Sequence, residues 1–209
     1  MSEQVVPVLL AVVGCVIAFL LGSVSPATII ARVLKQDLAH SGSGNPGATN
    51  AGRVLGVRWG LVVAVLDVLK GFLPAFVVLR TVGEHPAYLV GVAAVLGHVF
   101  SPFLKGRGGK GVATALGAVL AVQPWFGLVM LVVFAGVLAV GRWVAGASLA
   151  SAAVLVVLGV LAGLAVLPGS WATTVWAVTL AAVVVARHAA NIRGWLRARG
   201  LLRSDGAAS

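Results

Sequence analysis

Long apolar runs dominate the chain, and short stretches rich in glycine, proline and charge separate them. A run of about 20 mostly apolar residues is long enough to cross the hydrocarbon core of a bilayer as a helix. The pattern predicts seven such helices, near residues 5–31, 57–80, 86–103, 111–122, 125–141, 144–167 and 171–187. The fourth is short, and the glycine-rich residues 106–111 before it fit a loop that dips into the bundle.

Composition supports the membrane interpretation, because 60% of the residues are hydrophobic and only 10% are charged. The predicted fold class is an all-α integral membrane protein, one seven-transmembrane-helix bundle over residues 1–209 with a basic tail from about residue 188. The first run begins at Val5 without the basic segment or cleavage site of a secretory signal, so we expect it to be retained. The single cysteine, Cys15, excludes an intramolecular disulfide.

The positive charges predict the orientation of the bundle. In a soluble protein, fifteen Lys and Arg against five acids could indicate nucleic acid binding, but cytoplasmic loops of membrane proteins also collect cations. With the N-terminus outside and the C-terminus cytoplasmic, thirteen of the fifteen lie in inner segments: Arg32, Lys35, Arg53, Arg58, Lys105, Arg107, Lys110, Arg142, Arg187, Arg193, Arg197, Arg199 and Arg203. We therefore expect this topology and no nucleic acid partner.

The basic tail combines Arg193, Arg197 and Arg199 with Trp195 and Leu196. Basic and aromatic residues in this arrangement are typical of a helix that lies on the anionic inner leaflet. Residues 204–209 are predicted to be disordered.

The first polar stretch, "HSGSGNPGATNAGR", runs from His40 to Arg53. Its four glycines let the backbone approach a ligand, and successive N–H groups in such a loop can form an anion-binding nest. Arg53 adds a cation, and neutral hydrogen-bonding groups come from Ser43, Asn45, Thr49 and Asn50. A flexible turn between helices is the alternative. The stiffening Pro46 and the density of polar side chains favour a binding site.

The second polar group lies inside a predicted span, in "LDVLKGFLP", where Asp67 and Lys70 are one helical turn apart. A charge in hydrocarbon costs at least roughly 2.5 to 3.5 kcal/mol, so both groups should face the bundle interior and pair. The pair is either purely structural or part of a site. Gly71 and Pro74 favour the second interpretation, because they allow close packing and a local break.

The third group, "HVFSPFLKGRGGKG", begins at His98 and ends at Gly111. A glycine-rich loop that opens a helix can present free N–H groups to a phosphate, and basic side chains complete the charge. It is not a Walker A loop, because Gly111 stands where Ser or Thr would hold magnesium. A plain cytoplasmic linker explains the cations but not the glycine spacing, so we predict a phosphate site at the cytoplasmic face.

The later helices add smaller polar pairs, Ser148 with Ser151 and His188 with Asn191. Each pair shares a helical face, and packing or interfacial roles would also explain them. The histidines, Cys15 and the acids never cluster at ligand spacing, so we expect no metal and no cofactor. Neither a G-x-S-x-G elbow nor an H-x4-D motif occurs.

Together and in this order, these stretches resemble the motifs of the bacterial membrane acyl phosphate:glycerol-3-phosphate acyltransferases. The matching segments run from about Gly22 to Ile192: "GSVSPATIIARVLKQD", "GSGNPGATNAGRVLG", "LDVLKGFLP", "LGHVFSPFLKGRGGKGVATALG", "SLAS" and "RHAANI". The resemblance implies seven membrane helices in the bacterial cytoplasmic membrane, with the active site at the cytoplasmic face. It also implies acyl transfer from acyl phosphate to the 1-hydroxyl of sn-glycerol 3-phosphate, giving 1-acylglycerol 3-phosphate and phosphate for phospholipid biosynthesis. The soluble enzyme that makes acyl phosphate becomes a candidate partner.

The resemblance also implies site residues. It assigns catalysis to Ser43, Asn45, His98, Lys110 and His188. It assigns substrate and phosphate binding to Arg53, Thr49, Asn50, Lys70, Lys105, Gly108, Gly109, Gly111, Thr114, Ser148, Ser151 and Asn191. Three positions, Thr28, Ala39 and Gly106, depart from the usual residues of the family, which leaves Arg53 or Arg32 as the cation of the first loop.

Acyl phosphate is already an activated anhydride, so the enzyme must mainly align the hydroxyl and neutralise phosphates. Our hypothesis is that Lys105, Lys110 and Arg53 bind phosphate while N–H groups of residues 108–111 polarise the acyl carbonyl or hold the leaving phosphate. The base is either a histidine, His98 or His188, or a substrate phosphate oxygen. The last is preferred because neither histidine has a carboxylate partner close in sequence.

Two other classes remain open at this point. Interrupted helices and charges inside the bilayer are also typical of transporters, here of a phosphorylated solute. The convergence of cations on one face and the absence of inverted halves argue against that class. A structural or assembly protein would have no use for two polar glycine-rich loops.

Overall fold

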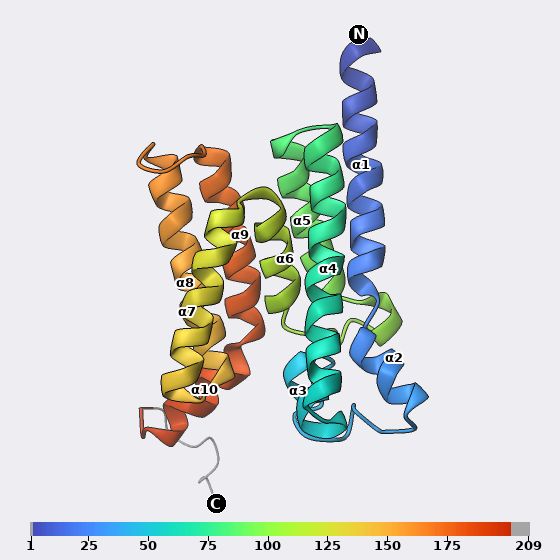
Figure 1. Ribbon diagram of the computed structural model, residues 1–209, viewed down its shortest axis with the longest axis vertical. Coiled ribbons are helices and arrows are strands. Elements are labelled where there is room, and N and C mark those ends of the chain that lie inside the picture. The colour runs from blue at the N-terminus through green and yellow to red at the C-terminus, as the bar shows by residue number, and fades with distance from the viewer. Residues whose placement is uncertain (1, 202–209) are drawn as a thin grey trace, which may run out of the picture.

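The computed structural model describes residues 2–201, and every regular element in that part of the chain is a helix (Figure 1). Ten α-helices and one 3₁₀ helix occur there: α1 (Ser2–Ser23), α2 (Pro26–Val33), α3 (Ala48–Leu55), α4 (Val57–Thr81), α5 (Glu84–Val99), η1 (Pro102–Leu104), α6 (Val112–Val122), α7 (Pro124–Gly141), α8 (Val144–Gly163), α9 (Trp171–Arg187) and α10 (Ala189–Ala198).

The helices form two groups with α6 between them (Figure 1). The first group contains α1, α4 and α5, with α2 and α3 at its lower end, and the second contains α7, α8 and α9. Helix α6 packs against α4, α5 and α7, so it joins the two groups. The start of α1 and helix α10 lie at opposite ends of the bundle.

Each of the seven predicted spans contains a helix, and the all-helical membrane class is confirmed. Five segments of the described chain are long and apolar enough to cross a bilayer, and the bent pair α9 and α10 makes a possible sixth. Helix α6 has 11 residues, so it is about 17 Å long against a hydrocarbon core of about 30 Å. The count of seven crossings and the outward N-terminus therefore stay predictions.

The first predicted span, residues 5–31, is broken between α1 and α2 at Val24 and Ser25. Pro26 has no N–H to continue the helix, so carbonyl groups at the end of α1 need other donors. Ser101 Oγ donates to the Ser23 carbonyl at 2.7 Å, and Lys70 Nζ donates to the Val24 carbonyl at 2.9 Å. Side chains from α4 and from the residue that precedes η1 therefore stabilise the break.

The stretch from residue 40 to residue 53 was predicted as a loop throughout, but its second half forms α3. The prediction missed this helix because Gly, Asn and Thr have low helix propensity. Its buried residues, Asn50 and Ala51, lie against α4 and the preceding loop.

Helices α4 and α6 approach each other closely at two glycines, one from each helix. A Cβ at Gly71 would overlap the carbonyl of Thr114, and a Cβ at Gly117 would overlap the carbonyl of Val68. Small residues at such crossings let two backbones touch, which strengthens van der Waals packing in a membrane. This contact fixes α6, and the loop that precedes it, against α4.

The crossing gives a stability prediction for Gly117→Ala. We expect a loss of about 1 to 3 kcal/mol, because the added methyl group has no room beside the Val68 carbonyl. Thermal unfolding in detergent measures it. Gly136→Ala in α7 is the control, since its Cβ would meet no atom within 4 Å and alanine favours helix. Equal midpoints for the two variants would contradict the prediction.

The basic tail begins with a helix, as predicted, and α10 makes an angle of 56° with α9. Trp195 of α10 stacks on Trp143, with 6.0 Å between ring centroids, and the Arg199 guanidinium lies 4.8 Å from the Trp195 ring centroid. These stacked rings hold α10 against the α7–α8 connection. The segment predicted to be disordered, residues 204–209, lies outside the described residues.

Candidate active site

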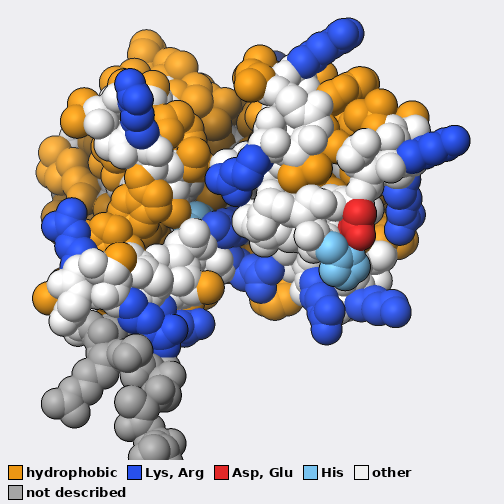
Figure 2. Space-filling model, turned by 90° about the horizontal axis from the view of Figure 1, so that it is seen from below, with side chains coloured by type: hydrophobic (Ala, Val, Ile, Leu, Met, Phe, Trp, Pro, Cys, Tyr) orange, Lys and Arg blue, Asp and Glu red, His pale blue; other side chains and the backbone are white. Residues whose placement is uncertain are grey.

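A cavity of about 700 Å³ lies between the two groups of helices. Seen from the end that carries α3 and α10, the surface is hollowed between the groups, and Lys and Arg side chains gather around the hollow (Figure 2). Its wall is made by the loop before α3, by α3 to α8, and by the α9–α10 junction. This volume is within the usual range for small-molecule sites.

Most of the residues predicted for the site line this cavity: Ser43, Asn45, Thr49, Asn50, Arg53, His98, Lys110, Gly111, Ser148, Ser151, His188 and Asn191. Segments that are far apart in sequence thus supply one polar wall. Arg53 lines the cavity, whereas Arg32 is exposed on α2, so the geometry favours Arg53 over Arg32 as the first-loop cation. Five predicted residues are not on the wall: Lys70, Lys105, Gly108, Gly109 and Thr114.

Asn50 holds the loop before α3 in place. Its Oδ1 accepts a hydrogen bond from the Ser43 N–H at 2.8 Å, and its Nδ2 donates to the Leu38 and Ser41 carbonyls at 3.3 and 3.1 Å. The side chain is 1% exposed and uses both ends in these bonds. Asn50 therefore orders the loop that presents Ser43. The resemblance had implied a different role for Asn50, a direct contact with the substrate.

The glycine-rich loop folds back onto the end of α5. The Gly108 N–H donates to the Val99 carbonyl and the Gly109 N–H to the His98 carbonyl, both at 3.1 Å. These two N–H groups are already in use, which corrects the hypothesis that the whole run 108–111 presents N–H groups to substrate. The donors left for an anion begin at Lys110, where the chain enters the first turn of α6.

Lys110 is the cation at the start of α6. Its Nζ donates to Asn191 Oδ1 at 2.7 Å, which links the glycine-rich loop to α10. Burial lowers the pKa of Lys110, and the positive charges of Arg187 and Arg53 lower it further. Three cations, Lys110, Arg187 and Arg53, converge here, and no carboxylate of the described residues forms an ion pair with them. This arrangement favours an anionic ligand.

Lys70 is not a wall residue of the cavity, so its predicted part in phosphate binding stays a prediction. Its Nζ lies 2.9 Å from Asp67 Oδ1 and donates to the Val24 carbonyl, and its side chain is 9% exposed. Asp67 is buried, and Val24 lies at the break between α1 and α2. From sequence, the Asp67–Lys70 pair was either purely structural or part of a site. For Lys70, the geometry supports the structural role.

Asp67, by contrast, lines the cavity beside His98. His98 Nδ1 lies 3.6 Å from Asp67 Oδ1, so this histidine has a carboxylate neighbour that its sequence position did not reveal. His98 Nε2 faces Gly109, where an added Cβ would overlap it. The ring is thus enclosed between α4 and the glycine-rich loop, and it supports that loop.

His188 lies at the break between α9 and α10 and is 1% exposed. Its Nδ1 lies 2.8 Å from the Val184 carbonyl, and a carbonyl can only accept, so Nδ1 carries the proton. In the neutral ring, Nε2 then keeps a free lone pair. Of the two histidines, His188 has the ring nitrogen better suited to accept a proton.

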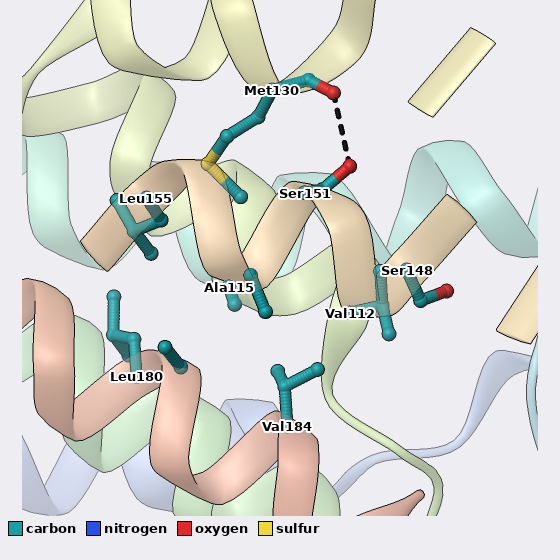
Figure 3. Close-up of a pocket in the computed structure, with 10 residues that line it drawn as sticks. Val112, Ala115, Met130, Ser148, Ser151, Leu155, Leu180 and Val184 are labelled. Atoms are coloured by element: carbon teal, nitrogen blue, oxygen red, sulfur yellow. Dashed lines mark hydrogen bonds between the residues drawn. The ribbon is translucent and has the colours of Figure 1, made fainter. Parts of the chain in front are cut away.

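Ser148 and Ser151 both donate inside the protein. Ser148 Oγ donates to the Val144 carbonyl, and Ser151 Oγ lies 3.1 Å from the Met130 carbonyl, a bond that joins α8 to α7 (Figure 3). Beyond Ser151 the space between α6, α8 and α9 narrows to a void of about 10 Å³. That void can hold at most about one water molecule, so the cavity ends there.

Two further predicted residues lie outside the cavity. Lys105 is exposed, with a left-handed backbone that ends η1, and its side chain belongs to the outer surface of the loop. Thr114 is fully buried, and its carbonyl packs on Gly71 of α4. Position in the motif suggested phosphate contacts for both, but the fold directs one outward and the other into the helix crossing.

Several wall residues were not predicted. Arg142 and Trp143 lie on the connection from α7 to α8, and an apolar side of the wall comes from α4, α6 and α7: Ala64, Val65, Val68, Leu69, Leu116, Met130, Leu131 and Phe134. In sequence, these apolar residues are indistinguishable from lipid-facing ones. The cavity therefore has a cationic, hydrogen-bonding end and an apolar side.

Comparison with known proteins agrees with this geometry. A family model described as glycerol-3-phosphate acyltransferase matches residues 12–198. The chain belongs to the glycerol-3-phosphate acyltransferase family. This confirms the resemblance stated from the sequence motifs.

Two members of the glycerol-3-phosphate acyltransferase family illustrate the similarity. The protein of that name from Aquifex aeolicus (strain VF5) is 38% identical over 186 residues, covering 88% of this chain and 94% of the relative. The one from Listeria monocytogenes serovar 1/2a (strain ATCC BAA-679 / EGD-e) is 38% identical over 183 residues, covering 84% and 88%.

Solved structures of the family agree as well. The glycerol 3-phosphate form of PlsY (YgiH), an integral membrane glycerol 3-phosphate acyltransferase, superposes with a TM-score of 0.84 at 35% identity, covering 94% of this chain and 96% of the other. A lysophosphatidic acid form of PlsY gives a TM-score of 0.81 at 35% identity, with 94% and 95% covered.

Proposed function

We propose that this protein transfers a fatty acyl group from acyl phosphate to the 1-hydroxyl of sn-glycerol 3-phosphate, releasing phosphate and 1-acylglycerol 3-phosphate. The observation that carries the proposal is a single cavity with a cationic end and an apolar side. One substrate is a small dianion, and the other joins a phosphate to an alkyl chain. A related PlsY structure in a glycerol 3-phosphate form supports the same substrate here.

The phosphates would lie at the cationic end. Lys110, Arg53 and Arg142 supply positive charge there, and the first turn of α6 supplies backbone N–H groups. The alkyl chain would lie along Leu131 and the other apolar residues of the wall. Because the void beyond Ser151 is too small for an alkyl chain, the chain would leave the cavity between α4 and α7, where apolar wall residues are exposed.

In the reaction, the glycerol hydroxyl oxygen attacks the acyl carbonyl carbon. A new carbon–oxygen ester bond forms, the bond from that carbon to the phosphate oxygen breaks, and the hydroxyl proton ends on the departing phosphate. The cations lower the barrier by holding both phosphates together and by stabilising charge on the leaving group. Ser43 and Asn45, which share the cavity wall, would orient the glycerol hydroxyl groups.

The first proton acceptor is a substrate phosphate oxygen or, within the protein, His188. His98 is less suited, because its Nε2 packs on Gly109. Turnover by His98→Gln and His188→Gln separates the two cases. Near-parental rates in both variants would leave the substrate phosphate as the acceptor.

For the cellular setting, we propose a bacterial cytoplasmic membrane, an outward N-terminus and a site open to the cytoplasm. The opposite placement of the start of α1 and of α10 supports an odd number of crossings. The cations around the hollow support a cytoplasmic face. Acyl phosphate would come from a soluble enzyme that acts before this one.

The decisive test supplies palmitoyl phosphate and glycerol 3-phosphate to the purified protein in lipid nanodiscs. Equal amounts of lysophosphatidic acid and phosphate are the expected products. The competing transporter function is tested in the same preparation reconstituted into liposomes. Uptake of glycerol 3-phosphate without acyl product would replace the proposal with transport.

The lowered pKa of Lys110 gives a pH prediction. Lysine binds phosphate only while protonated, and it loses that charge as pH rises through its pKa. Because burial, Arg187 and Arg53 lower this pKa, the affinity for glycerol 3-phosphate should fall at a lower pH than an ordinary lysine would cause. Calorimetric dissociation constants between about pH 7 and pH 10 measure the fall, in the range below the usual lysine pKa of about 10.4.

Lys110→Gln is the control for that pH series. Its affinity should be weaker throughout and should lack the alkaline fall. The other ionisable groups on the cavity wall are Arg53, Arg142, Asp67, His98 and His188. An equal alkaline fall in parent and Lys110→Gln would assign the titration to a different group.

A further inference from the structure

Arg187, the last residue of α9, contacts the backbone of the glycine-rich loop at Gly108 and Gly109. Its Nη2 donates to the Gly108 carbonyl at 2.9 Å, and its Nε donates to the Gly109 carbonyl at 3.3 Å. The side chain is half-buried and is not part of the cavity wall. From sequence, Arg187 was only one of the inner-side cations, and nothing in the motif spacing predicts this contact.

The two carbonyl contacts fix the direction of two successive peptide groups. In a trans peptide, the C=O and the following N–H point in opposite directions, and the described chain contains no cis peptide. The Gly108 carbonyl faces Arg187 while the Gly109 N–H donates to the His98 carbonyl on the other side. By the same rule, the Gly109 carbonyl faces Arg187 and the Lys110 N–H points away from it.

We propose that Arg187 is a positioning residue that orients Lys110 by binding the carbonyl oxygens of Gly108 and Gly109. The consequence for acyl transfer rests on the function proposed above. With both carbonyls held by the guanidinium, their negative ends are turned away from the phosphates. Without that contact, a glycine peptide could rotate and place a carbonyl oxygen where the substrate needs a donor.

The guanidinium suits this task better than an ammonium group would. Its donors form a rigid planar fork, so one side chain can bind two neighbouring carbonyl oxygens in a fixed geometry. Direct binding of phosphate by Arg187 is the competing role. The observed contacts direct two of its N–H groups to the loop backbone, and its absence from the cavity wall favours positioning.

The test compares Arg187→Met with Arg193→Met in the full-length protein in nanodiscs. Arg193 is an exposed arginine of α10, so it controls for loss of one cation at this end of the bundle. We expect faster amide hydrogen exchange in residues 106–112 of Arg187→Met, with the rest of the bundle unchanged. We also expect about a 100-fold loss of acyl transfer, mainly in kcat, because a misplaced catalytic group can cost this much.

Two outcomes separate positioning from the competing roles. Arg187→Lys keeps the positive charge but not the planar fork of donors. If Arg187 bound phosphate directly, KM in this variant would stay close to that of the parent. If Arg187 positions the loop, kcat in this variant stays low. Unchanged exchange in the loop of Arg187→Met, or a kcat within about threefold of the parent, would overturn the proposal. If Arg187→Met does not fold, Arg187→Gln carries the same comparison with one amide donor.

The proposed function can fail independently of this inference. If the parent protein makes no acyl product, the acyltransferase proposal fails. Hydrogen exchange in the loop then still decides whether Arg187 positions it.

Discussion

Lys110→Ala should lower kcat/KM for acyl transfer by about 100- to 1000-fold, the usual cost of removing one preorganised donor from a site that stabilises developing charge. Its ammonium group is the cation that the fold places on the cavity wall at the start of α6, next to Arg53. Formation of lysophosphatidic acid from palmitoyl phosphate and glycerol 3-phosphate measures the loss. Thermal unfolding of the variant shows whether the bundle stays intact.

Lys105→Ala is the matched control for that experiment. Both lysines belong to the same loop and the same motif, but the Lys105 side chain is exposed and is absent from the cavity wall. We expect its kcat/KM to remain within about threefold of the parent. Equal losses in the two variants would contradict the structure and support the phosphate-binding part that the motif implied for Lys105.

Gly109→Ala should be the second large loss, again of about 100-fold in kcat. A Cβ at this position would overlap His98 Nε2, and the ring is confined on its other side by Asp67. Either the ring or the loop must move, and both movements displace Lys110. The assay is the same, with hydrogen exchange in the loop as the structural measurement.

The control for this substitution is Gly194→Ala in α10. A Cβ there would meet no atom within 4 Å, so the added methyl group disturbs neither the loop nor the helix. Parental activity of Gly109→Ala would show that His98 and the loop can separate without consequence for the site.

Much of the fold was predictable because lipid imposes strong rules on sequence. Apolar runs located helices at all seven predicted spans, and the predicted span 171–187 coincides with α9. The break before Pro26 was missed because the residues around it are still apolar enough to continue a span. What makes the break stable is a contact from Lys70 to the Val24 carbonyl, 46 residues away in sequence. Local pattern carries no signal for that contact.

The site was predictable in its parts but not in its assignment of roles. Motif residues such as Ser43, Lys110 and Asn191 meet on one wall. Motif position alone could not separate groups that face the ligand from groups that hold the backbone, as Asn50 does. The apolar side of the wall, including Phe134, was hidden because lipid and an alkyl chain select the same side chains.

The two sides of the cavity determine whether a substrate's effective concentration is its concentration in the membrane or in water. Its apolar side includes exposed Val65, Leu69 and Leu131 on the outer surface of α4 and α7, while the cationic end is at the hollow between the helix groups. A substrate that arrives through the first route is sampled from the plane of the membrane, and one that arrives through the second is sampled from water. A plot of rate against substrate would therefore use mole fraction in lipid for the first kind of substrate and molar concentration in water for the second. Under the function proposed above, the acyl donor would take the first route. Its mole fraction among the lipids would then be the controlling quantity, and adding inert lipid at constant bulk concentration would dilute it.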